Sequence, residues 1–162
     1  MRIPSQTLAV CLLLAAAMVT ACGMTTNPSP TTAPTGSLVA PDGSLTAPLP
    51  GQTDTEWGRI WETVPANFPI YPGSTLSEEA ATGPASATLL AEGAVAKEIA
   101  GWMDEQLQLD GYAIESSSGP LEDGSYVLEA ERDDGCRTQV TVAPRGSLTT
   151  ITILYGASCP NA

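Results

Sequence analysis

The side chains that could carry acid–base chemistry in this sequence are carboxylates, because its 162 residues include no histidine. This excludes Ser-His-Asp and Cys-His catalysis and metal sites that need imidazole. A glycosidase-like hydrolase would need two converging carboxyl groups, and the adjacent acidic pairs are Glu78-Glu79, Glu122-Asp123 and Asp133-Asp134. Neighbouring residues on a strand point to opposite faces, and the last two pairs precede glycines in turn-like segments. We therefore expect no catalytic residue among them.

The same turns, Glu122-Asp123-Gly124 and Asp133-Asp134-Gly135, are also candidates for collecting Ca²⁺ through carboxylate and carbonyl oxygens. Neither has the spacing of an EF-hand loop, and no phosphate-binding loop or dinucleotide fingerprint is present. We predict no metal and no cofactor. A small-ligand or Ca²⁺ binding module stays open as an alternative.

Four large aromatic residues lie close together in the sequence, at Trp57, Trp61, Phe68 and Tyr71. Such a group can form an edge that binds a carbohydrate or a peptide. A small domain also needs large apolar side chains for its core, and core packing is the favoured interpretation. The four residues are kept as candidate ligand-binding residues.

The first 23 residues have the anatomy of an export signal. Arg2 supplies positive charge, an apolar stretch runs from Leu8 to Val19, and Thr20 and Ala21 precede Cys22. The run Val19-Thr20-Ala21-Cys22 resembles the lipobox of bacterial lipoproteins, with valine where leucine is most common. The resemblance implies diacylglycerol on the Cys22 sulfur, cleavage before Cys22 and acylation of the exposed amine, with palmitate as the expected acyl group.

A permanent membrane-spanning helix is disfavoured, because it needs about 20 apolar residues and polar residues follow Cys22 at once. An uncleaved anchor or an ordinary signal peptide is the alternative. We expect a lipid anchor in the cell membrane or the outer membrane, with the domain on the extracytoplasmic side.

Two cysteines remain once Cys11 leaves with the signal and Cys22 carries the lipid. In an exported protein, Cys136 and Cys159 are expected to form a disulfide. A redox-active thiol is the sharper alternative, but no C-x-x-C motif supports it.

Charge bears on the partners. The chain carries six basic and eighteen acidic side chains, a net charge of −12, and loss of Arg2 makes the processed chain more acidic still. Such a surface repels nucleic acid and anionic lipid headgroups, so we predict no nucleic-acid partner. Cationic partners and divalent ions stay open.

Composition divides the chain into three parts: a signal peptide at 1–21, a linker at 22–55 and a domain at 56–162. The linker is rich in Pro, Thr, Ser, Gly and Ala, which favours a disordered tether with a reach of roughly 30 Å. The remaining length is enough for one hydrophobic core.

Periodicity predicts one long amphipathic helix that ends before Gly111. Its expected apolar face consists of Val95, Ile99, Trp102, Met103 and Leu109. A shorter amphipathic turn or helix is expected over residues 57–64.

Strands are expected over residues 75–81, 86–91, 112–116, 125–131, 137–143 and 148–155. The inward-facing sets are expected to be Tyr126/Leu128/Ala130, Val140/Val142 and Ile151/Ile153, with Thr150 among the outward residues. These elements predict an α+β fold, an antiparallel meander sheet of about five to six strands with one amphipathic helix on one face. A last hairpin turning at residues 144–147 would set Cys136 opposite Tyr155.

Together these features predict a lipid-anchored bacterial cell-envelope protein whose domain is not an enzyme and binds an envelope protein or a cell-wall component. The rival is a carboxylate-dependent hydrolase acting on an envelope polymer.

Overall fold

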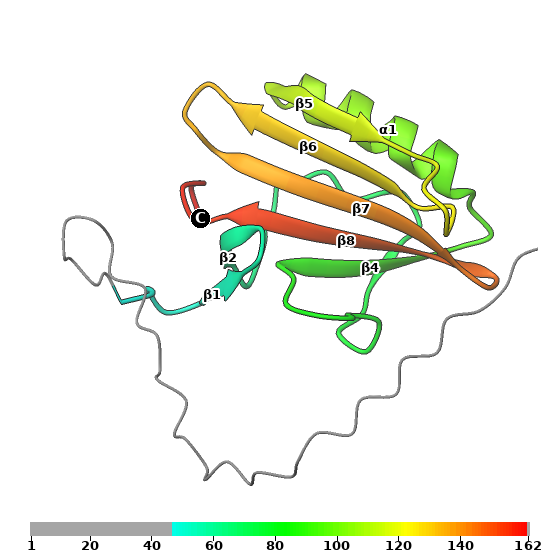
Figure 1. Ribbon diagram of the computed structural model, residues 1–162, viewed down its shortest axis with the longest axis horizontal. Coiled ribbons are helices and arrows are strands. Elements are labelled where there is room, and N and C mark those ends of the chain that lie inside the picture. Colours follow the sequence, from blue (N-terminus) through cyan, green and yellow to red (C-terminus); the bar gives the residue numbers. More distant parts are fainter. Residues whose placement is uncertain (1–46, 162) are drawn as a thin grey trace, which may run out of the picture. The chain divides into compact units, whose positions relative to one another are not determined.

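The computed structural model describes residues 47–161, so the signal segment with Cys22 and most of the predicted tether lie outside the described residues. The described chain folds into an antiparallel sheet with one helix packed on it (Figure 1). The predicted α+β architecture is confirmed. In chain order the elements are β1 Gln52–Thr55, β2 Gly58–Trp61, β3 Thr75–Leu76, β4 Ala87–Glu92, α1 Ala96–Leu109, β5 Tyr112–Ser118, β6 Tyr126–Arg132, β7 Arg137–Arg145 and β8 Leu148–Gly156.

Strands β5, β6, β7 and β8 form a meander, each paired with the next in the chain. The β7–β8 hairpin closes tightly, because Arg145 pairs with Leu148 and Gly146 takes a left-handed φ of 66°. This tight turn sets Thr138, and not Cys136, opposite Tyr155. The expected register was wrong by two residues. A shift of two keeps every side chain on its predicted face.

The other edge of β8 pairs with two strands placed end to end. Trp61 of β2 pairs with Tyr155, and Ala87 of β4 pairs with Ile153. The sheet therefore has eight strands in place of the five to six predicted. The additional strands are β1 and β2, because the two-residue β3 lies within the strand predicted over residues 75–81.

The helix or turn predicted over residues 57–64 is wrong, because Gly58–Trp61 is strand β2. Its partner β1 lies within the range predicted as linker, so the ordered domain begins before residue 56. Pairing of β2 with β8 makes this segment a strand. The two strands are slightly less than one hundred residues apart, so their pairing leaves no local periodicity. Only Thr75 and Leu76 of the strand predicted at 75–81 pair with β4.

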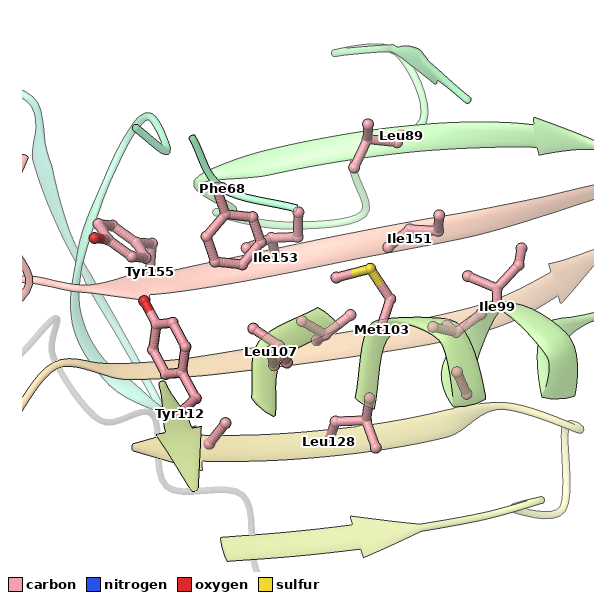
Figure 2. Close-up of a cluster of buried hydrophobic side chains, with 14 of the residues drawn as sticks. Phe68, Leu89, Ile99, Met103, Leu107, Tyr112, Leu128, Ile151, Ile153 and Tyr155 are labelled. Carbon is pink, nitrogen blue, oxygen red and sulfur yellow. The ribbon is translucent and has the colours of Figure 1, made fainter. Parts of the chain in front are cut away.

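The main core lies between α1 and one face of the sheet (Figure 2). From the helix, Ile99, Met103 and Leu107 are fully buried, and they meet Ile151 and Ile153 of β8. The predicted inward-facing sets are confirmed, with Tyr126 only partly buried. Two residues of the predicted helix face are corrected: Val95 is 58 % exposed and Leu109 is 78 % exposed. Both lie at the ends of the helix, beyond the sheet face that buries its middle.

Gly111 follows the helix with a φ of 84°, as the predicted stop requires. The helix contacts β5, β6 and β7, so it covers the meander side of the sheet. Leu89 and Ala91 of β4 belong to the same core cluster as the buried residues of the helix.

Candidate functional site

The junction between β2 and β4 is held by the hydroxyl of Ser86. This oxygen accepts the backbone N–H of Tyr155 at 2.8 Å and donates to the carbonyl of Trp61. The residue is 6 % exposed, and its own N–H donates to the carbonyl of Ile153 at 2.8 Å. One side chain thus closes the gap between two strands that share one edge of β8.

Two short strands of the same sheet, β1 and β3, flank this junction without closing it. Strand β1 begins at Gln52, opposite Trp61, and β3 ends at Leu76, opposite Leu89. Between them lies a hollow of about 770 Å³, bounded on its outer side by residues 77–85. We call it the edge hollow. The lining residues that matter for its chemistry are Thr53, Glu62, Glu78, Gly83, Ser86 and Thr88.

Two buried apolar residues lie outside the main core. Ile60 is fully buried and Ala80 is 9 % exposed, and neither belongs to the cluster beneath α1. Ile60 precedes Trp61, whose partner Tyr155 lies in the main core, so the alternation of a strand places Ile60 on the opposite face. Residues on this face are thus partly covered without any helix.

Two polar side chains give the edge hollow its chemical character. Thr88 is 5 % exposed, and its Oγ1 has no hydrogen-bond partner within the protein. Glu62 lies exposed at the rim, where its Oε1 accepts the hydroxyl of Thr53 at 2.6 Å. No lysine or arginine is among the lining residues, all of which are described. The hollow therefore combines apolar walls, an unsatisfied hydroxyl and an acidic rim.

The acidic pairs are separated from one another and serve local structure in two of three cases. Asp123 Oδ1 accepts both the N–H and the hydroxyl of Ser125, at 3.0 and 2.6 Å. Asp134 accepts the N–H of Cys136 at 3.0 Å and forms an ion pair of 2.6 Å with Arg132. These interactions lower the pKa of Asp123, chiefly through the Ser125 hydroxyl, and that of Asp134, chiefly through Arg132.

Glu78, from the remaining pair, lies at the edge hollow, and its carbonyl accepts the N–H of Ala81 at 3.2 Å. Within residues 47–161, no group of three or more His, Cys, Asp or Glu side chains is placed to hold a metal ion.

The four candidate aromatic residues do not form one surface, because each has a different partner. The Phe68 ring meets Tyr155 edge-on at 5.7 Å, and the Tyr71 ring meets Trp102 at 5.4 Å. Trp61 Nε1 donates to the carbonyl of Cys159 at 3.0 Å. Trp57 lies under the guanidinium of Arg137 at 5.7 Å. Packing within the domain accounts for these contacts.

The Sγ atoms of Cys136 and Cys159 are 2.07 Å apart, at disulfide distance, and join the end of the chain to the start of β7. Around this bond, the hydroxyl of Tyr112 lies 3.3 Å from Cys136 Sγ, and the hydroxyl of Tyr155 donates to the carbonyl of Pro160 at 3.1 Å. Burial is the main cause that raises the pKa of both tyrosines above the usual range. The cluster fixes the C-terminal tail against the sheet.

Comparison with protein-family models, with curated proteins and with solved structures finds no match for this chain. Within the part of the chain that the structure describes, no helix has both the length and the apolar character needed to cross a bilayer. Cys22, the predicted lipidation site, lies outside the described residues.

Sequence reasoning did not identify the edge hollow or Thr88. The only local signal was the run of small residues from Ala80 to Ala87, where the sequence predicts the end of one strand, a break at Gly83-Pro84 and the start of the next strand. Small side chains leave space where a loop crosses a sheet. A run of small residues beside a short strand is therefore the sequence pattern that would indicate such a hollow.

Proposed function

We propose that this chain is a bacterial lipoprotein, anchored through Cys22, whose domain binds an envelope protein or a cell-wall component without acting as an enzyme. The anchor rests on the run Val19-Thr20-Ala21-Cys22 and the apolar stretch before it. The Cys136–Cys159 pair supports an oxidising location, because disulfides persist outside the cytoplasm. The domain then works on the extracytoplasmic side of the cell membrane or the outer membrane.

The edge hollow is the observation that carries the binding role. Its volume lies within the range of ordinary ligand sites, and its walls are largely apolar with a few polar groups. Two of the three acidic pairs are engaged in turns, as described above, which favours holding a partner over hydrolysing one. The binding domain stands on a linker long enough to search the space near the membrane.

The anchor is tested by replacing Cys22 with alanine in the full-length protein and labelling cells with an alkyne fatty acid. We expect labelling to disappear and the protein to leave the membrane fraction or stay unprocessed. Cys11→Ala is the matched control, because it removes a thiol from the same segment and should leave labelling unchanged. Full labelling of the Cys22→Ala protein would refute the anchor.

The binding role is tested with a photo-crosslinking amino acid at Ala81, which is exposed at the edge hollow, and at Glu105, which is exposed on α1. We expect a discrete envelope component crosslinked from position 81 and absent from position 105. Cleavage of an envelope glycan or peptide by the purified protein, without any such crosslink, would contradict the non-enzymatic role.

A further inference from the structure

We infer that the edge hollow binds an extended peptide segment of the partner that has small side chains and one basic residue. This inference rests on the proposed function for its setting, since it names the part of the partner that the domain holds. Four observations support it: the shape of the sheet edge, the size of the lining residues, the charge of the rim and the unpartnered hydroxyl of Thr88.

The shape of the sheet edge favours an extended chain. Strand β1 starts and β3 stops on either side of the hollow, so the outer strand of this edge is interrupted there. Ser77 still donates its N–H to the carbonyl of Thr88 at 2.9 Å, which marks the last backbone contact before the interruption. Peptides commonly bind by adding a strand to such an exposed edge.

The lining residues set the size of the side chains that fit. The inner and outer walls consist mainly of alanine, glycine, serine, threonine and proline, and the volume of about 770 Å³ accommodates only a few residues. A segment with small side chains can bring its backbone close to such walls.

The rim of the edge hollow favours a positively charged ligand. Glu62 and Glu78 lie exposed at the hollow, and no basic residue lines it. The chain as a whole carries a net charge of −12, so the field around the hollow attracts cations. A lysine or arginine in the bound segment would be attracted to these two carboxylates.

Thr88 is the polar group that a ligand would satisfy. A buried hydroxyl without a partner costs free energy, and it gains a hydrogen bond when a backbone carbonyl or N–H of a bound segment reaches it. The hydroxyl of Ser86 differs from that of Thr88, because its one donor hydrogen is already used on the carbonyl of Trp61 and it also accepts from Tyr155.

The test uses the full-length protein purified in detergent and a fluorescent alanine-rich tetrapeptide with one central lysine, measured by fluorescence anisotropy. We expect saturable binding that weakens with added salt. The same peptide with glutamate in place of lysine should bind at least tenfold more weakly. Equal binding of the two peptides, or no binding of either, would overturn the inference.

Filling the hollow should abolish binding. At Gly83, which lines the hollow, no atom lies within 4 Å of the position of an added Cβ, so Gly83→Leu can be built without a backbone clash. Gly101→Leu is the matched control, because Gly101 is exposed on α1 and has the same free space. We expect loss of peptide binding only for Gly83→Leu, and equal binding by both variants would contradict the site.

Thr88→Val separates a ligand contact from a structural role. Valine keeps the shape and removes the unpartnered hydroxyl, so the stability of the free protein should stay equal or rise while the Kd rises about threefold to tenfold. Loss of stability with unchanged Kd would refute a contact with the peptide.

Changing both Glu62 and Glu78 to glutamine should raise the Kd by about threefold to tenfold and flatten its salt dependence. The control changes Glu98 and Glu105, which are exposed on α1, and should leave the Kd unchanged.

Other occupants would give other results. If Gly83→Leu converts a dimer to a monomer in sedimentation while the peptide fails to bind, a second copy of the chain fills the hollow and the inference is wrong. Tight binding of an uncharged amphiphile in place of the lysine peptide would also overturn it. The Cys22 labelling result is independent of all these outcomes, so failure here leaves the anchor standing.

Discussion

The hydroxyl of Ser86 accepts the backbone N–H of Tyr155 at 2.8 Å, although the two residues are 69 positions apart in the chain. The same hydroxyl donates to the carbonyl of Trp61, so a single oxygen joins β2 and β4 where both meet β8. This contact fixes the inner wall of the edge hollow, since Ser86 is one of its lining residues.

Replacing Ser86 with alanine should lower the free energy of unfolding by about 1–3 kcal/mol, because it leaves two backbone groups unpaired beside the core. Urea unfolding followed by tryptophan fluorescence measures this change. Ser118→Ala is the control, since Ser118 is exposed at the end of β5 and should alter stability by no more than about 0.5 kcal/mol. Equal effects of the two substitutions would show that the bridge contributes nothing.

Two leucines of α1 provide a direct test of the core. Leu107 is fully buried, whereas Leu109, two residues later, is 78 % exposed. Leu107→Ala should destabilise the domain by about 2–5 kcal/mol, through lost burial and the cavity that remains. Leu109→Ala should cost no more than about 0.5 kcal/mol. Comparable losses in thermal unfolding would contradict the packing of the helix.

The Cys136–Cys159 disulfide should be a major contribution to stability. Its sequence separation of 23 gives about 3 kcal/mol from the restriction of the unfolded chain. We expect reductant to lower the unfolding midpoint of the wild-type protein in urea. A variant with both cysteines changed to alanine should start near the reduced value and show no response to reductant, and any response there would point to another target.

Burial of Tyr112 makes stability depend on alkaline pH. The pKa of Tyr112 in the folded protein is raised, chiefly by burial, above the value of about 10 expected in the unfolded chain. Its contribution to stability is therefore complete below about pH 10 and is lost as the pH rises towards the folded pKa, because only the unfolded state releases the proton.

Tyr112→Phe should consequently reduce the loss of stability between pH 8 and pH 11, measured by urea unfolding at each pH. Burial also raises the pKa of Tyr155, so this variant should keep a smaller dependence of stability on alkaline pH. A slope identical to that of the wild-type protein would show that Tyr112 does not titrate on unfolding.

Much of the fold follows from local patterns. The helix at 96–109 has a clear 3.6-residue period and the glycine that ends it, and the strands of the meander alternate between turns rich in Gly, Asp and Pro. The disulfide partners follow from the count of cysteines once Cys11 and Cys22 are assigned. The helix and the strands follow from patterns within a few residues, and the cysteine pair follows from counting.

The sequence by itself thus determined the helix, the meander β5–β8 and the faces of its strands. Burial of one face of a helix or strand imposes a periodic pattern of apolar residues, and this pattern can be recognised within a short stretch of sequence. Only the tertiary structure decided that Gly58–Trp61 is a strand, since β2 pairs with β8, about one hundred residues away. Strand β1, which lies within the expected linker, pairs in turn with β2. The edge hollow with its unpartnered Thr88 was decided in the same way. It exists because β1 starts and β3 stops on either side of it, and the spacing between strands distant in sequence leaves no local pattern.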